Sequence, residues 1–101
     1  MVNVTRWTEA EPPDEDGILR MMQTEGRRPY HWSNGPGDVY AAHKHDYNKV
    51  IYVVRGSITF GLPDTGEEIY LHAGDRVDLP QGVTHNARVG PLGVACLEAH
   101  R

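Results

Sequence analysis

The chain has 101 residues, of which 39% are hydrophobic and 24% are charged, and its net charge is −4 at pH 7. This length favours one domain with one modest core. The acidic balance argues against a nucleic-acid partner, because phosphate binding uses clustered lysine and arginine side chains.

Cysteine content and hydropathy bear on where the protein acts. Cys96 is the only cysteine, so no disulfide can form within the chain. No segment has the apolar run of a signal peptide or the length needed to cross a bilayer. We therefore expect a cytoplasmic protein without a membrane partner.

The first third of the chain predicts an N-terminal arm. Residues 1–7 alternate apolar and polar side chains, which is typical of a short strand. Residues 9–17 are acidic, contain adjacent prolines and predict a loop or extended arm. Residues 18–22 form a short apolar run that suits either a strand or one helical turn. Residues 26–37 contain five glycine or proline residues and predict a structured loop that carries large aromatic side chains.

From residue 38 onward, strands are expected to alternate with turns. β-Branched residues are frequent in the predicted strands, and the breaks between them contain glycine, proline, asparagine or aspartate. The expected strands cover residues 38–45, 49–55, 57–62, 67–72, 77–79, 83–89 and 93–100. Short strands at this spacing, with no convincing long helix, indicate an all-β sandwich or barrel.

Two histidines are the first sign of chemistry. Alternate side chains of a strand share a face, so His43 and His45 are expected to project to the same side. Two imidazoles on one face are half of a metal site.

The surrounding residues carry a family resemblance. The segment Gly37-x5-His43-x-His45-x3-Lys49-x6-Gly56 resembles the first signature of the cupin superfamily, G-x5-H-x-H-x3,4-E-x6-G. The segment Gly74-x5-Pro80-x-Gly82-x2-His85-x3-Val89 resembles the second, G-x5-P-x-G-x2-H-x3-N. The two signatures occur in the expected order, and the resemblance covers residues 37–89.

The resemblance implies a small single-domain cupin. Its fold would be all-β, a jelly-roll barrel (double-stranded β-helix) with at most short helical turns. Residues 1–36 would form the N-terminal arm and strands, residues 37–89 the core barrel, and residues 90–101 the closing strand. Many members of the family are dimers, and many hold one divalent metal ion.

The resemblance also implies a metal centre with three histidine ligands. His43, His45 and His85 match ligand positions, whereas Lys49 stands where cupins carry a glutamate, and Val89 replaces the closing asparagine. Imidazole nitrogen suits divalent Zn, Fe, Mn, Ni or Cu. Three nitrogens with open positions for water or substrate make a catalytic rather than a structural type of site. Some cupin dioxygenases likewise use three histidines without the carboxylate.

Lys49 leaves several interpretations open, because an ammonium group has no lone pair and cannot bind a metal. The side chain could reach solvent from the end of its strand. It could bend away to an acid, with Glu98, Asp78 or Glu68 as candidates. It could stay inside as a base or as a hydrogen-bond donor to an anionic substrate, which makes it a candidate catalytic residue. It could also replace the cation and leave a metal-free pocket.

Most of the other aromatic, histidine and cysteine residues are expected to be structural. Aromatic residues at a pocket mouth are conceivable at Trp32, Tyr40 and Tyr47, although such residues beside a strand more often belong to the core. Tyr52 is expected to pack in the sheet, and Cys96 to be a small buried residue rather than a nucleophile. Surface positions are expected for the histidines that match no ligand position: His31, His72 and His100.

Three functions are compatible with the sequence. A metal-dependent oxygenase or isomerase would act on a small polar or anionic molecule, with the metal as Lewis acid or oxygen activator. A non-catalytic module would bind a small molecule in the same pocket, and a metal-free barrel would serve ligand binding or assembly. In each case we expect a homodimer, in which residues 2–7 and 18–22 could cover the sheet edges of a second chain.

Overall fold

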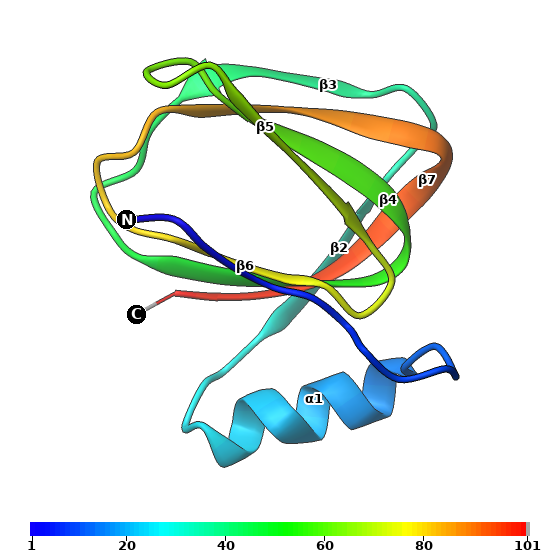
Figure 1. Cartoon of the computed structure of the whole chain (residues 1–101). Coiled ribbons are helices and arrows are strands. Elements are labelled where there is room, and N and C mark those ends of the chain that lie inside the picture. Colours follow the sequence, from blue (N-terminus) through cyan, green and yellow to red (C-terminus); the bar gives the residue numbers. More distant parts are fainter. Residues whose placement is uncertain (101) are drawn as a thin grey trace.

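Seven β-strands and one α-helix make up residues 1–100, the part of the chain that the computed structural model describes (Figure 1). Every strand pairing is antiparallel, so the predicted all-β fold is confirmed. The elements are β1 (Asn3–Thr5), α1 (Glu15–Thr24), β2 (Tyr30–Asn34), β3 (Val39–His43), β4 (Lys49–Leu62), β5 (Glu67–His72), β6 (Arg76–Leu79) and β7 (His85–His100).

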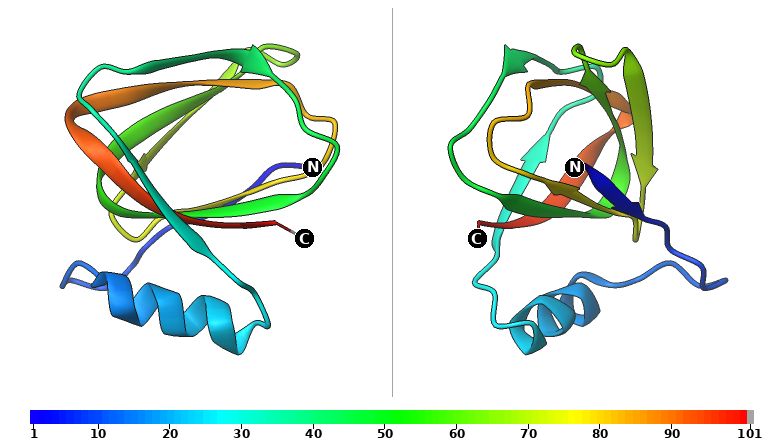
Figure 2. Two further views of the ribbon diagram at one scale, coloured as in Figure 1. Left: turned by 180° about the vertical axis from the view of Figure 1, so that it is seen from behind. Right: turned by 60° about the vertical axis from the view of Figure 1, so that its left-hand side comes forward.

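Two long strands, β4 and β7, pair with each other along most of their length and hold the barrel together. The first half of β4 also pairs with β6, and β6 pairs with β1, while β2 pairs with the last part of β7. The second half of β4 pairs with β5, and β3 pairs with the first part of β7. The strands therefore form two layers that curve over each other and enclose the core (Figures 1 and 2).

A glycine allows β4 to bend from one layer to the other. Gly56 has a φ of 77°, and a Cβ atom there would lie 2.0 Å from the carbonyl oxygen of Gly93 on β7. The pairing register shifts on both sides of this glycine. The sequence predicted separate strands at 49–55 and 57–62. These predictions are wrong in one respect, because β4 keeps its pairing with β7 through the bend. In the same way, β7 is continuous where strands at 83–89 and 93–100 were expected.

The barrel interior is apolar, and side chains enter it from alternate positions of β4 and β7. Ile51, Val53, Ile58 and Phe60 point inward from β4 and are 4% exposed or less. The intervening residues Val50, Tyr52 and Val54 lie in a second apolar cluster on the outer face. The alternation of side chains along the strand therefore decides which β4 residues reach the interior. Lys49 lies two residues before Ile51 and so is on the same, inward face.

The second apolar cluster is covered by α1, which lies beneath the barrel (Figure 2). The helix begins after Asp14, whose side chain accepts a 2.7 Å hydrogen bond from the Gly17 amide and caps the first turn. Ile18 and Met22, one turn apart, are fully buried against the sheet. The loop expected at 9–17 therefore ends early, and the run at 18–22 belongs to a helix of ten residues rather than to a strand or one turn.

The prediction of a structured loop at 26–37 is wrong for the central part of this segment, which forms β2. Tyr30 pairs with Glu98 and Trp32 pairs with Cys96 across the β2–β7 ladder. The glycine and proline breaks lie on both sides of this strand rather than within it. Within residues 1–100, no helix is long and apolar enough to span a membrane.

Candidate metal centre and its cavity

Three histidines converge at one end of the barrel. His43 ends β3, His45 lies in the loop that follows, and His85 begins β7 directly opposite His43 in the pairing register. Each offers a ring nitrogen, and these atoms all lie within 4.8 Å of one another. The ring centroids are 4.5 Å apart for His43 and His85 and 4.8 Å apart for His43 and His45. The structure thus brings together the three residues that the signatures pointed to.

Backbone carbonyl groups orient two of these rings. Nδ1 of His43 lies 2.7 Å from the carbonyl oxygen of Ala41, and Nδ1 of His85 lies 3.0 Å from that of Val83. A carbonyl can only accept a hydrogen bond, so each Nδ1 carries the proton and donates it. In the neutral ring the lone pair is then on Nε2. This is the arrangement by which proteins orient histidine ligands toward a metal.

The histidine pocket favours the neutral form of two of the imidazoles. His85 is only 3% exposed, and burial lowers its pKa, with further lowering by the positive charge of Lys49. Burial and Lys49 also lower the pKa of His45. Neutral imidazole is the form that binds metals, so burial keeps these two rings in the state that a metal needs. The positive charge of Lys49 acts in the opposite direction on a bound cation.

The donor set itself also fits a divalent transition metal. Three imidazole nitrogens without a carboxylate suit borderline ions such as Zn, Fe, Ni or Cu better than Mg or Ca, which prefer oxygen ligands. Because only three protein ligands are present in the cluster, positions would remain for water or a substrate.

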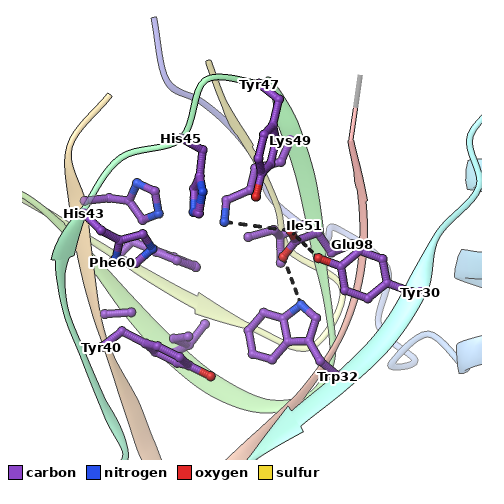
Figure 3. A pocket seen from close by; sticks show the side chains of 13 residues that line it. Tyr30, Trp32, Tyr40, His43, His45, Tyr47, Lys49, Ile51, Phe60 and Glu98 are labelled. Atoms are coloured by element: carbon purple, nitrogen blue, oxygen red, sulfur yellow. Dashed lines mark hydrogen bonds and ion pairs between the residues drawn. The ribbon is translucent and has the colours of Figure 1, made fainter. Parts of the chain in front are cut away.

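The histidines line one end of a cavity of about 260 Å³ (Figure 3). Most of its remaining wall is apolar or aromatic, and this part is formed by Trp32, Tyr40, Ile51, Ile58, Phe60 and Ala87. A pocket that combines an apolar wall with a few convergent polar groups is typical of sites for small organic molecules.

Lys49 lies in the cavity wall and not in solvent. Its residue surface is 9% exposed, and it points inward like Ile51 (Figure 3). Its Nζ lies 3.8 Å from Oε2 of Glu98, so Glu98 is the partner among the three acids considered. Asp78 instead pairs with Arg76. Burial lowers the pKa of Lys49, and the negative charge of Glu98 partly opposes this effect.

Glu98 is a site residue that the sequence indicated only as a possible partner of Lys49. It is 5% exposed, and its carboxylate accepts hydrogen bonds from Tyr30 (2.7 Å), His100 (2.8 Å) and Trp32 (3.0 Å). Burial alone would raise its pKa, but the bond from Tyr30 and the charge of Lys49, helped by the other bonds, lower it. Glu98 is therefore a buried carboxylate that stays ionised.

The other aromatic residues and histidines divide between the cavity and the surface. Trp32, Tyr40 and Tyr47 all line the cavity, so they belong to the pocket rather than to a sealed core. His100 is a surface residue, as expected, with its side chain 39% exposed. It also donates a hydrogen bond to Glu98 and packs against Tyr47 at a centroid distance of 4.1 Å.

Four more residues lie where the sequence placed them. Cys96 is buried, and burial raises the pKa of its thiol, so it is inert as a nucleophile. Tyr52 is buried in the sheet. His31 and His72, which like His100 match no ligand position, are exposed.

Comparison with known proteins gives one family match. The sequence model of a family described as Cupin domain matches residues 30–90, which include all three histidines. A search among proteins of curated function gave no significant match.

Several solved structures are similar in fold. A DUF861 family protein from Thermotoga maritima has a TM-score of 0.66 and 18% identity, with 100% of both chains covered. An RmlC-like cupin from Shewanella frigidimarina has a TM-score of 0.63 and 26% identity, with 73% of this chain and 64% of that chain covered. The polyketide cyclase RemF from Streptomyces resistomycificus has a TM-score of 0.65 and 25% identity, with 73% of this chain and 54% of that chain covered.

Proposed function

The chain belongs to the cupin domain family, as its two signatures predict, and from that premise we propose that it is a metal-dependent enzyme. His43, His45 and His85 would hold one divalent ion, and the cavity would take a small polar or anionic molecule. The reaction class is oxygenation or isomerisation. The observation that carries this proposal is the convergence of three imidazole nitrogens at the end of a largely apolar cavity.

A bound divalent ion would polarise a substrate oxygen or activate dioxygen at its open positions. The residues of the chain supply orientation and environment. The carbonyl groups of Ala41 and Val83 fix two imidazoles, which lowers the reorganisation needed for binding. The apolar wall, including Ile51 and Phe60, excludes water and thereby strengthens electrostatic interactions with a substrate.

The similarity to RemF supports a reaction on a small organic molecule. RemF is by name a polyketide cyclase, and this chain matches just over half of it. We extend to this chain only the class of substrate, an organic molecule.

A non-catalytic binding module is the second candidate function, and one feature favours it. Glu98, the carboxylate of the cavity wall, already accepts three hydrogen bonds and is poorly placed to act as a general base. Two assays separate the candidates. An isomerase loaded with Zn²⁺ would exchange the α-protons of small 2-oxo acids for deuterium, and an oxygenase loaded with Fe²⁺ would consume dioxygen. A binding module would do neither.

Titration of the untagged protein with Co²⁺, followed by visible absorption, tests the metal site. We expect absorption bands that saturate at one ion per chain and that are lost in His85→Ala. His45→Ala should also remove the bands. Because His45 is less buried than His85, this variant is less prone to misfold, so loss of the bands there reports on the ligand itself. His31→Ala is the matched control, because His31 is exposed and outside the cluster. Equal bands in all three variants would contradict the proposal.

A further inference from the structure

The ammonium group of Lys49 faces the cavity, and no group within residues 1–100 accepts a hydrogen bond from it. Its side chain is 10% exposed, and its one ion pair, with Glu98, spans 3.8 Å. That separation is too long for a hydrogen bond. Within residues 1–100, every fully enclosed side-chain nitrogen or oxygen has a hydrogen-bond partner. Nζ of Lys49 is therefore open to the cavity, and its N–H groups are available to a ligand.

Glu98 balances the charge of Lys49 without taking its hydrogens. Oε2 of Glu98 accepts bonds from Tyr30 and His100, and Oε1 accepts one from Trp32. Figure 3 shows the bonds from Tyr30 and Trp32. These three donors hold the carboxylate in place from the side of β2 and the end of β7. The carboxylate thus keeps a positive charge favourable at Lys49, while the ammonium donors point toward the ligand space.

The rest of the wall defines what kind of anion would fit. Ile51, Ile58 and Phe60 give an apolar surface to the cavity that the ammonium group faces. One cation with a fixed carboxylate behind it suits a single negative charge better than the double charge of a phosphate. The wall is therefore complementary to a monoanion with an apolar or aromatic body.

We propose that Lys49 is the anion-binding residue of this cavity and that its ligand is a small organic carboxylate with an apolar or aromatic body, an assignment of substrate class that rests on the proposed function. The carboxylate accepts hydrogen bonds from Nζ of Lys49, and the body packs on Ile51 and Phe60. Glu98 acts as a positioning residue for the ammonium group.

Calorimetric titration of the full chain with benzoate tests this assignment, with benzamide as the neutral probe of the same shape and inorganic phosphate as the dianion. The protein is used both with Zn²⁺ and after chelation. Lys49→Met removes the charge but keeps the length of the side chain, and Glu98 retains three hydrogen bonds, so the variant should fold. Lys49→Arg keeps the charge. Thermal unfolding of both variants checks that they are folded.

We expect benzoate to bind the chelated protein, and Lys49→Met to weaken this binding by about tenfold or more. Lys49→Arg should retain part of the affinity, and benzamide and phosphate should bind weakly to every form. Equal affinity of the wild type and Lys49→Met for benzoate, including no binding to either, overturns the assignment. Failure of the metal proposal would look different: Co²⁺ would leave no spectrum while the dependence of benzoate binding on Lys49 persisted.

Discussion

Asp75 shows how a single buried carboxylate can fasten the N-terminal arm to the barrel. Its side chain is fully buried and accepts hydrogen bonds from the amides of Trp7 (2.9 Å) and His72 (3.1 Å) and from the side chain of Arg6 (3.0 Å). Burial alone would raise the pKa of Asp75, but these bonds lower it below its ordinary value. At neutral pH the charged form therefore stabilises the fold.

Asp75→Asn should lower the free energy of unfolding by about 2–3 kcal/mol at neutral pH, because an amide accepts these bonds less well and adds donors of its own. The pKa of Asp75 is lowered in the folded state, so its contribution is present above the unfolded value of about 3.9. It is lost as the pH falls through the lower, folded value.

Urea unfolding at neutral pH and at about pH 3 measures this dependence. The difference between wild type and Asp75→Asn should shrink at the acid pH. Asp64→Asn, in an exposed turn, is the matched control and should change little. A difference that is equally large at both pH values would contradict the electrostatic explanation.

At the scale of elements, α1 is held against the barrel by its one buried, apolar face. Met22 is fully buried beneath the barrel, whereas its neighbour Met21 is 39% exposed. Met22→Ala should lower the free energy of unfolding by about 2–5 kcal/mol, because it leaves a cavity in the outer cluster. Met21→Ala should change it by less than about 0.5 kcal/mol. Chemical unfolding of both variants checks this, and similar losses would show that α1 does not pack as described.

The bend of β4 depends on a glycine with two separate constraints. Gly56 and Gly66 both have a positive φ, but only at Gly56 would a Cβ atom meet another strand, 2.0 Å from the carbonyl oxygen of Gly93. Gly66→Ala should cost about 1–2 kcal/mol for the backbone conformation alone. Gly56→Ala should cost clearly more, because β4 and β7 must also move apart. Thermal unfolding compares them, and equal losses would mean that the close approach is unimportant.

For the whole molecule, motif spacing in the sequence predicted most of the site. The three histidines meet because the signatures fix both their offsets and the strands that carry them. Strand parity could also have placed Glu98 in the wall, since it alternates with the buried residues Cys96 and Val94. What spacing could not supply was the conformation of the Lys49 side chain, which depends on a carboxylate distant in sequence.

Two elements of the fold were missed for physical reasons. β2 has no β-branched residue, and the glycine and proline residues on both sides of it favoured a loop, whereas pairing with β7 places it in the sheet. The short apolar run in α1 gave no clear period by itself. Only the cap at Asp14 and the one-turn spacing of Ile18 and Met22 distinguish the helix from a strand.

A homodimer remains a prediction, and the structure shows how the two segments first considered are used within the chain itself. β1 pairs with β6 of its own chain, and Ile18 and Met22 are buried on their own sheet. The short edge strands β1 and β2 end the strand order and leave edges for a second copy. Sedimentation at micromolar concentration should give twice the mass of the chain, and a monomer there would contradict the prediction.

The metal content of the protein tests the central claim most directly. Protein produced without a histidine tag, in medium with trace transition metals, is dialysed and analysed by elemental mass spectrometry. We predict close to one divalent transition-metal ion per chain in the wild type and in His31→Ala, and a loss of most of it in His45→Ala and His85→Ala. A wild-type protein without metal, which also fails to take up added Zn²⁺, Fe²⁺ or Co²⁺, would contradict the three-histidine metal centre.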